Sequence, residues 1–281
     1  MNPRISVVIN TLNEEHNLPL ALDSVCRWVD DIVVVDMHSN DRTATVARAY
    51  GARVFLYERL GYADPARAFA LAQATGDWVL VLDADEVVPA ALAAQLHAIA
   101  RRGDFDAADL PYQNFVGGVA VRGLGWGPTQ DHHVRFFRQG QMRVTGEVHN
   151  FFHPLPGTRV LRLPYQGDNA LLHFSYTDYT SVMEKINRYT GIEAQTKQGQ
   201  GVRPSLLRET ALPVREFLLT FLVKRGYRDG RHGLRLAVLL ALYKYLREIK
   251  LDERVQRGTR EDMLNRYRQL ARQAIHPKDP L

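Results

Sequence analysis

The sequence predicts an α/β fold built on a mainly parallel sheet with helices on both faces. Two observations support this prediction. Short runs of β-branched and aliphatic residues alternate with helix-compatible segments over the first hundred residues. The runs are apolar throughout, which is typical of strands that are buried on both faces. Together these features indicate repeated strand–helix–strand units, whose crossover connections favour parallel strands.

The expected elements follow one another as strand, helix, strand, helix. The strands are expected at 5–9, 32–35, 53–56 and 78–82, and the helices at 14–28, 42–50, 65–74 and from about Pro89 onward. The polar segment 39–41 offers N-terminal caps for the second helix, while Gly51 and Gly76 end the second and third helices. Pro89 suits a helix start, because its missing N–H would have no partner there.

The pattern changes twice in the rest of the chain. From about Phe105 to His173, glycine, proline, histidine and aromatic residues are frequent, and 134–137 forms a plausible short strand. After Asp178 the apolar spacing becomes helical, and 234–251 is expected to be a helix that is apolar on much of its surface. We therefore expect an irregular middle segment followed by a helical appendage.

Composition excludes several classes of protein. With 46% hydrophobic and 24% charged residues, the chain has ample apolar surface to bury, so disorder over most of its length is not expected. Cys26 is the only cysteine, which excludes an intrachain disulfide framework and a Cys-rich zinc site. No apolar run approaches the ~20 residues of a membrane-spanning helix. The run 5–9 is also shorter than the apolar core of a secretory signal.

Charge divides the chain into a mildly acidic body and a basic tail. Residues 1–200 carry 18 basic and 22 acidic side chains, a net charge of −4, and residues 201–281 carry 18 and 9, a net charge of +9, which together give the total of +5. A basic amphipathic tail can lie on an anionic membrane, or it can pack on the body with a solvated charged face. Nucleic-acid binding is a third interpretation, but no nucleic-acid-binding motif accompanies the charge.

Polar residues follow three of the four expected strands. They are 10–15 after the first strand, Asp36 after the second, and 83–86 after the fourth. The carboxyl ends of parallel strands meet at one edge, where such sheets bind ligands. Asp83 and Asp85 could there hold Mg²⁺ or Mn²⁺, which prefer oxygen ligands and often share them with substrate phosphates. The plainer alternative is a pair of exposed loop acids.

These motifs resemble those of the family 2 glycosyltransferases, which have the nucleotide-sugar-binding fold called GT-A. The matching segments are 5–15, 33–43, 74–78 and 82–86, which occur in order and at the usual spacing. The resemblance implies a GT-A catalytic domain over 1–200, with a nucleotide-sugar half at 1–103 and an acceptor half at 104–200. Residues 201–281 would then be the basic helical C-terminal appendage.

The resemblance also implies roles for individual residues. The nucleotide-binding residues would be Thr11, Leu12, Asn13, Glu14, Asp36, Ser39, Arg67, Asp83 and Ala84, and the metal ligands would be Asp85, Asp83, His173 and His149. Asp36 would hydrogen-bond a uracil-type base, and Asp85 would be the principal ligand of Mg²⁺ or Mn²⁺. Arg67 could face the diphosphate, although Ala68 follows it where many members have asparagine.

The second half of the chain narrows the resemblance to the bacterial lipopolysaccharide-core glucosyltransferases. The matching segments are 135–138, 146–150, 172–176, 184–189, 224–230 and 233–234. Inverting transfer needs a general base, and that subfamily usually has glutamate directly after the histidine that matches His149. Here Asn150 stands in that place and cannot act as a base. Glu147 or Asp131 would replace it, unless the acceptor carries its own negative charge and needs little base catalysis.

We therefore expect an inverting glycosyltransferase that transfers a hexose from a nucleotide sugar, with UDP as the expected nucleotide, to a lipid-linked or cell-envelope glycan acceptor. An anionic membrane surface is the expected further partner, and nucleic acid is not expected. The protein would be cytoplasmic and peripheral on the inner face of the bacterial inner membrane.

Two alternatives stay open. A sugar nucleotidyltransferase would need a Gly-rich phosphate loop with Arg and Lys after the first strand, where this chain has 13–15, Asn-Glu-Glu. A catalytically inactive sugar- or lipid-binding scaffold is kept open by Asn150.

Overall fold

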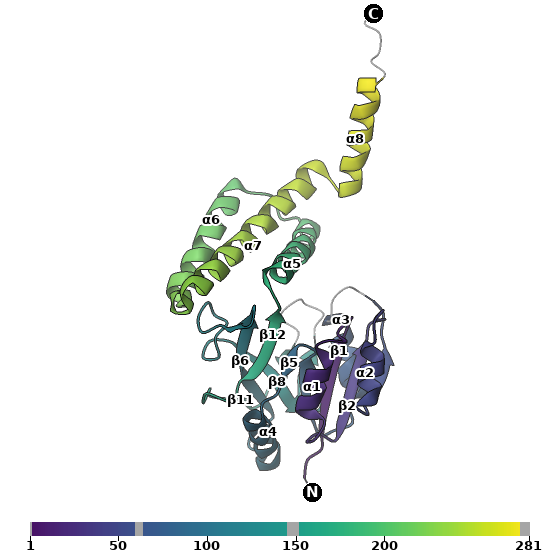
Figure 1. Cartoon of the computed structure of the whole chain (residues 1–281), viewed down its shortest axis with the longest axis vertical. Coiled ribbons are helices and arrows are strands. Elements are labelled where there is room, and N and C mark those ends of the chain that lie inside the picture. Colours follow the sequence, from purple (N-terminus) through teal and green to yellow (C-terminus); the bar gives the residue numbers. More distant parts are fainter. Residues whose placement is uncertain (1, 60–63, 145–151, 276–281) are drawn as a thin grey trace, which may run out of the picture. The chain divides into compact units, whose positions relative to one another are not determined.

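The computed structural model describes residues 2–59, 64–144 and 152–275, which form two compact units (Figure 1). The first unit comprises Met1–Arg122 and Trp126–Thr177, and the second comprises Gly123–Gly125 and Asp178–Leu281. The expected boundary between 200 and 201 lies inside the second unit, after its first long helix, and stays a prediction.

The first unit is built on a ten-stranded sheet. Its strands are β1 (Ile5–Thr11), β2 (Asp31–Asp36), β3 (Arg53–Leu56), β4 (Trp78–Asp83), β5 (Glu86–Val87), β6 (Ala107–Val116), β7 (Val119–Ala120), β8 (His132–Arg138), β11 (Val160–Arg162) and β12 (Leu171–Tyr176). The order across the sheet is β3-β2-β1-β4-β8-β6-β12-β5, and β7 and β11 pair with β6. A separate two-stranded sheet joins β9 (Met142–Val144) and β10 (Phe152–Pro154).

The first four strands form a wholly parallel part of this sheet, which we call the parallel half. β2 pairs parallel with both β1 and β3, and β4 pairs parallel with β1 on its other side. The register aligns Thr11 with Asp36 and Asn10 with Asp83, so the carboxyl ends of β1, β2 and β4 lie side by side. β8 then runs antiparallel to both β4 and β6. The three motif-bearing strand ends therefore meet at one edge, as the sequence predicts.

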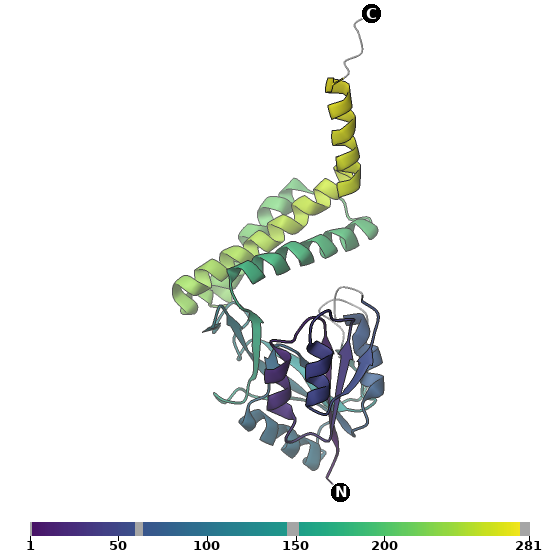
Figure 2. The ribbon, with the colours of Figure 1, turned by 45° about the vertical axis from the view of Figure 1, so that its right-hand side comes forward.

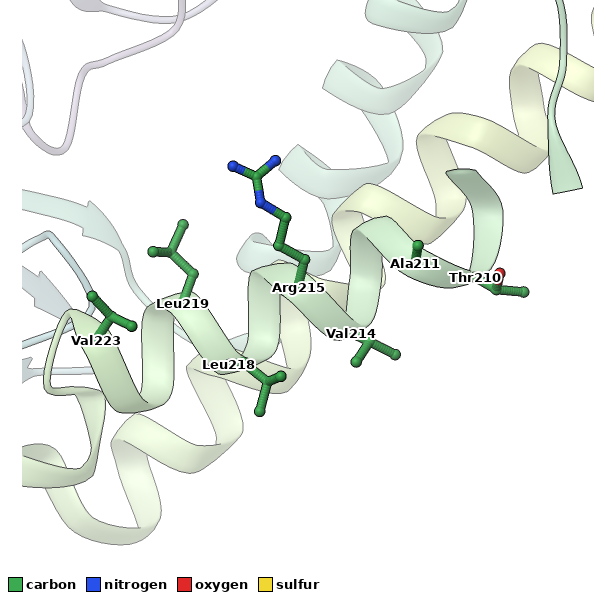
Figure 3. Close-up of a pocket in the computed structure, with 7 residues that line it drawn as sticks. All are labelled: Thr210, Ala211, Val214, Arg215, Leu218, Leu219 and Val223. Carbon is green, nitrogen blue, oxygen red and sulfur yellow. The ribbon is translucent and has the colours of Figure 1, made fainter. Parts of the chain in front are cut away.

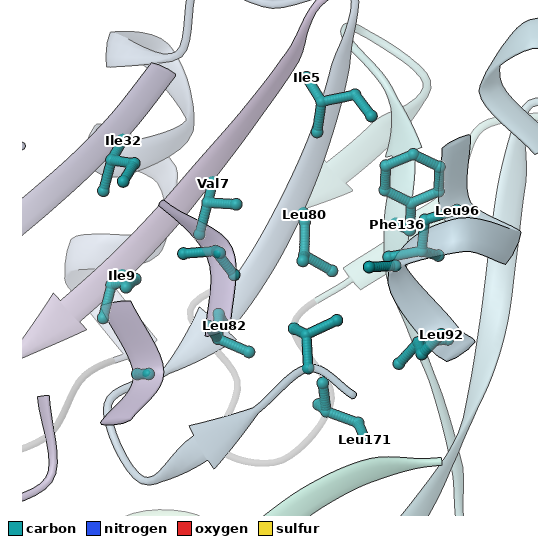
Figure 4. Close-up of a cluster of buried hydrophobic side chains, with 14 of the residues drawn as sticks. Ile5, Val7, Ile9, Ile32, Leu80, Leu82, Leu92, Leu96, Phe136 and Leu171 are labelled. Carbon is teal, nitrogen blue, oxygen red and sulfur yellow. The ribbon is translucent and has the colours of Figure 1, made fainter. Parts of the chain in front are cut away.

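Helices cover both faces of the parallel half (Figures 1 and 2). They are α1 (Leu18–Val25), α2 (Thr43–Ala49), α3 (Asp64–Gln73) and α4 (Ala90–Arg102). On one face, Ile5 and Ile9 of β1 belong to a core with Leu92 of α4 (Figure 4). Leu22 of α1 belongs to the same core. On the other face, Val8 packs in a second core with Ala66 of α3. The predicted α/β fold class is thus confirmed.

The first helix begins later than the sequence predicts, at Leu18 rather than near Glu14. The segment before it is held as a loop, because Asn13 has a left-handed backbone with φ 58° and the N–H groups of Asn13, Glu14 and Glu15 donate to side chains that follow β2. Gly76 behaves as expected. A Cβ atom there would lie 2.7 Å from the main-chain nitrogen of Ser6, so only glycine fits beside β1.

The second unit consists of helices. They are α5 (Tyr179–Gly199), α6 (Leu206–Leu218), a π-helical turn (Leu219–Val223), a 3₁₀ turn (Gly226–Asp229), α7 (Gly230–Arg257) and α8 (Arg260–Ile275). Asp178 caps α5, because its Oδ1 accepts a hydrogen bond of 2.7 Å from the N–H of Ser181. α7 packs against both α5 and α6. None of the helices in the described ranges is long and apolar enough to cross a membrane.

A buried carboxylate joins the three packed helices of this unit. Glu248 of α7 is 1% exposed. It accepts from Lys197 Nζ of α5 at 2.6 Å and pairs with Arg247 Nη2 at 2.9 Å and Arg208 Nε of α6 at 3.5 Å. Burial by itself would raise the pKa of Glu248, but the hydrogen bond from Lys197 and the charges of Lys197 and Arg247 outweigh it and lower the pKa.

Candidate active site

The loops that follow β1 and β2 are bound to each other through side chains. Asn13 adopts a left-handed backbone conformation with φ 58°. Its Oδ1 accepts from the N–H of Asn40 at 2.8 Å, and its own N–H donates to Ser39 Oγ at 2.8 Å. The N–H of Glu14 donates to Thr43 Oγ1 at 2.8 Å. These reciprocal bonds make the two loops one fixed surface beside the strand ends.

Asp36 closes β2 beside this surface and is nearly buried. Its Oδ1 accepts hydrogen bonds from the N–H and the hydroxyl of Ser39, whereas its Oδ2 accepts none from the described residues. A carboxylate oxygen placed in this way can accept the N–H of a nucleobase. Thr11 is the register partner of Asp36. Four of the predicted nucleotide-binding residues, Thr11, Asn13, Asp36 and Ser39, are therefore brought together.

Two other predicted nucleotide-binding residues serve the apolar packing. Leu12 packs against the core on the α3 side of the sheet, and Ala84 is buried in the core on the opposite side. The Ala84 side chain is thus enclosed in the protein, whereas the Leu12 side chain keeps part of its surface exposed.

The acid that ends β4 forms the centre of a buried ion cluster. Asp83 Oδ1 accepts from Arg67 Nη2 of α3 at 2.9 Å, and its Oδ2 accepts from Arg135 Nη2 of β8 at 3.0 Å. Glu86 completes the cluster, because its Oε2 accepts from the N–H of Asp83 at 2.8 Å and its Oε1 lies 3.5 Å from Arg135 Nη2. Only 6% of the Arg67 side chain and 8% of the Arg135 side chain are exposed, so these carboxylates compensate guanidinium charges that are largely removed from water.

The two carboxyl groups of this cluster respond to burial in opposite ways. Burial would raise the pKa of Asp83, but the charges of Arg135 and Arg67 outweigh it and hold the pKa far below its ordinary value. Glu86 is completely buried, and this burial raises its pKa despite the nearby Arg135. Asp83 is thus the ionised partner of the arginines. Arg67, which is predicted to face the diphosphate, is already paired with Asp83 in this structure.

Asp85 lies in the turn between β4 and β5, opposite a histidine of β12. His173 Nε2 is 3.6 Å from Asp85 Oδ2, and the N–H of Phe174 donates to the carbonyl oxygen of Asp85 at 2.9 Å. β12 pairs antiparallel with β5, which aligns His173 with Glu86. The structure therefore brings together Asp85 and His173, two of the predicted metal ligands, although they are far apart in sequence.

An asparagine of β6 fixes the orientation of the His173 ring. Asn114 Nδ2 donates to Asp131 Oδ2 at 2.6 Å and to the carbonyl oxygen of Trp126 at 2.8 Å. The Asn114 amide oxygen therefore faces His173 Nδ1, at 2.7 Å, and this nitrogen must carry a hydrogen. Nε2 is then the nitrogen that faces Asp85. Burial disfavours the imidazolium form, but the neighbouring Asp85 carboxylate outweighs burial and raises the pKa of His173.

The donor set at this point fits a divalent cation that shares its ligands with a substrate. Asp85 and His173 offer one carboxylate and one imidazole. This mixed pair suits Mn²⁺, and the carboxylate oxygens of Asp85 also suit Mg²⁺. Within the described ranges, no three His, Cys, Asp or Glu side chains are gathered closely enough to hold an ion by themselves. A cation bound through one or two protein groups commonly completes its shell with phosphate oxygens. His149, the remaining predicted ligand, lies outside the described residues.

One of the two candidate bases can be placed in the structure. Asp131 Oδ1 lies 2.9 Å from Nε2 of His133, and Oδ2 accepts the hydrogen bond from Asn114. Through Asn114, this carboxylate is connected to His173 and so to the Asp85 side of the site. Glu147 and Asn150, three residues further on, lie outside the described residues. The identity of the base stays a prediction.

Three residues of this site were not identified from the sequence as site residues: Glu86, Asn114 and Arg135. Each stands in a strand, and each is buried with at most 6% of its surface exposed. A charged or amide side chain within such a strand was the signal that could have marked them, because buried polar groups need partners. Their partners come from distant segments, and that pairing is not visible in local sequence.

Comparisons with known proteins agree with the resemblance. The family model described as Glycosyl transferase family 2 matches residues 6–160, more than half of the chain. An uncharacterized glycosyltransferase of Rickettsia bellii is 25% identical over 264 residues, which cover 90% of this chain and 87% of the relative. The lipopolysaccharide core biosynthesis glycosyltransferase LpsC of Rhizobium meliloti is 28% identical over 265 residues, which cover 89% of this chain and 92% of the relative.

A solved structure with partial likeness is that of glucosyl-3-phosphoglycerate synthase from Mycobacterium tuberculosis in complex with Mg²⁺ and uridine diphosphate. It is 30% identical, with a TM-score of 0.34, and the match covers 41% of this chain and 44% of that chain. At this TM-score the two structures are too different for a comparison residue by residue.

Proposed function

The chain belongs to glycosyl transferase family 2, and we propose that it transfers a hexose from a UDP-linked sugar to a lipid-linked or cell-envelope glycan acceptor. Family membership supports glycosyl transfer as the reaction class. The observation that most strongly supports this chain as an active enzyme is the Asp85–His173 pair beside the buried Asp83–Arg67–Arg135 cluster. Both stand at the strand edge where sheets of this class bind ligands.

The donor nucleotide would bind over the fixed surface formed by the loops after β1 and β2. Asp36 Oδ2 would accept the N–H of a uracil-type base, and the bonds between Asn13, Ser39 and Asn40 would keep that surface in place. The diphosphate would extend toward the end of β4, where Asp85 and His173 lie. Such a binding surface is formed before the donor arrives, so little ordering would oppose binding.

Asp85 and His173 would hold Mg²⁺ or Mn²⁺, which offsets the negative charge of the departing diphosphate. The residues around Asp85 and His173 would keep these two side chains facing each other. Asn114 orients the His173 ring through Nδ1, and the pairing of β12 with β5 brings His173 opposite the turn that holds Asp85. Arg67 and Arg135 would keep Asp83 ionised beside the same turn.

The acceptor hydroxyl would attack the sugar carbon from the face opposite the nucleotide, which inverts the configuration in one step. A general base would take the proton of that hydroxyl as the new bond forms. Asp131 and Glu147 are the candidates, and an acceptor with its own negative charge would reduce the need for either. The LpsC relative is named for lipopolysaccharide core biosynthesis, which supports an envelope glycan as the acceptor. The enzyme would then act as a peripheral protein at the inner face of the bacterial inner membrane.

The test is a screen of UDP-hexoses with Mn²⁺ and an extract of envelope lipids, in which release of UDP is measured. The wild type should release UDP with at least one donor, and Asp85→Ala should lower the rate by about 100-fold or more. Asp104→Ala is the matched control, because Asp104 is a half-exposed acid of the same unit, paired with Arg102. UDP binding without release from any donor would favour the inactive scaffold, and full activity of Asp85→Ala would refute the metal assignment.

A further inference from the structure

The helix α6 exposes a row of apolar side chains, in addition to the half-buried Leu212 and Phe217. Leu207, Ala211, Val214, Leu218 and Leu222 recur at helical spacing, so they lie on one side of α6 and its π-helical continuation. All five are exposed, with 75% of Leu207, 60% of Val214, 47% of Leu218 and 52% of Leu222 accessible. We call this set the outward stripe. Figure 3 shows Val214 and Leu218 projecting to one side of the helix, whereas Arg215 projects to the other.

Polar side chains of α6 make ion pairs with α7. Arg208 Nε lies 3.5 Å from the buried carboxylate Glu248, and Lys244 Nζ lies 4.0 Å from Glu216. A helix that only needed to cover this bundle would bury its leucines and leave its charges in water. α6 instead exposes the outward stripe, and a contiguous exposed apolar surface of this kind marks a binding surface.

The charge around the outward stripe indicates what it binds. Residues 203–231 contain seven Lys and Arg side chains and three acidic ones, a net charge of +4. Two of the acids, Glu216 and Asp229, are engaged inside the unit, with Lys244 and with the N–H of Gly123. Arg203, Arg215 and Arg225 are exposed. The stripe is therefore accompanied by cations, which complement an anionic surface.

We propose that α6 lies in the plane of an anionic phospholipid bilayer, with the outward stripe in the apolar interface and the neighbouring arginines at the headgroups. The stripe extends about 20 Å along the helix at 1.5 Å per residue, which suits a helix that lies on a membrane. A symmetric contact between two copies of this face would bring the same cations toward each other, which opposes dimerisation there. The proposal rests on the proposed function in one respect, because a lipid-linked acceptor gives a reason for contact with the membrane.

The test is sedimentation of the full chain with vesicles of phosphatidylcholine containing 30% phosphatidylglycerol, compared with phosphatidylcholine alone. The wild type should bind the anionic vesicles, and binding to neutral vesicles should be at least about ten-fold weaker. Leu218→Asp/Leu222→Asp should lower binding to anionic vesicles by at least about ten-fold. The matched control is Leu264→Asp/Leu270→Asp on α8, where the leucines are 44% and 53% exposed, and it should bind like the wild type.

Three results would overturn the proposal: no binding of the wild type to anionic vesicles, equal loss in both double variants, or dimers in lipid-free gel filtration that disappear with Leu218→Asp/Leu222→Asp. The last result would assign the outward stripe to a second copy of the chain. Circular dichroism checks that each variant is folded. Release of UDP from the donor without vesicles is measured in parallel, because it should be the same in wild type and stripe variant. A failure of membrane binding is thereby separated from a failure of the proposed activity.

Discussion

Replacing Asp83 with alanine tests whether the acid at the end of β4 is the counter-charge of two buried arginines. The substitution removes the acceptor of Arg67 Nη2 at 2.9 Å and of Arg135 Nη2 at 3.0 Å. Arg135 would keep Glu86 at 3.5 Å as its neighbouring carboxylate. Removing one partner of a buried ion pair costs about 3–5 kcal/mol, so we expect Asp83→Ala to lower the free energy of unfolding of the first unit by about that amount.

The loss in the free energy of unfolding can be measured for the first unit within the full chain. The three tryptophans, Trp28, Trp78 and Trp126, all belong to this unit, so their fluorescence during urea denaturation reports its unfolding. With a denaturant slope of about 2 kcal/mol/M, the midpoint should fall by about 1.5–2.5 M urea. Adding Arg67→Met to Asp83→Ala should restore part of the loss, because one of the two buried cations is then gone. A loss below about 1 kcal/mol, with additive effects in the double variant, would refute the ion cluster as the main role of Asp83.

Three further predictions follow from the same contacts. Asn114→Leu removes the acceptor of His173 Nδ1 and should weaken Mn²⁺ binding in the presence of UDP by about 10–100-fold in calorimetry; unchanged affinity would contradict the orienting role. If Asp131 is the base, Asp131→Asn should lower kcat by about 10²–10⁴-fold with UDP affinity unchanged, whereas Glu147→Gln should do so if Glu147 is the base; full activity of both variants would leave an acceptor that supplies its own charge. Glu248→Gln should cost about 3 kcal/mol at pH 7. Because the folded pKa of Glu248 lies below its ordinary value of 4.5, this difference should be complete above about pH 4.5 and shrink as the pH falls further; a difference that is constant down to pH 3 in thermal unfolding would contradict it.

The parallel half of the sheet could be predicted because its signals are local. The apolar runs that predict strands 32–35 and 78–82 fall within β2 and β4. Gly76 lies three residues after the end of α3, where the chain must approach β1 closely. The first helix was placed four residues too early, because bonds to the residues that follow β2 hold the segment after β1 as a loop. Those bonds join segments about 26 residues apart, and helical spacing gives no sign of them.

The site residues that directly follow the parallel strands could be predicted from the sequence, whereas those contributed by β6 and β8 could not. Asp36, Asp83 and Asp85 follow strands directly, so their position at one edge comes from the topology of a parallel sheet. Arg135 and Asn114 reach the same edge through the antiparallel strands β8 and β6, whose order in the sheet does not follow the order of the chain. The compensation of Asp83 by Arg135, which lies 52 residues away, is thus a property of the folded sheet.

The anomeric configuration of the product tests the proposed inverting transfer most directly. The full chain would be incubated with Mn²⁺, envelope lipids and an isotopically labelled α-linked UDP-hexose, and the new glycosidic bond would be examined by nuclear magnetic resonance. The account predicts a β-linked hexose on a lipid or glycan acceptor, formed by the wild type and by Asp104→Ala and absent with Asp85→Ala. An α-linked product, or the same product with Asp85→Ala, would contradict it.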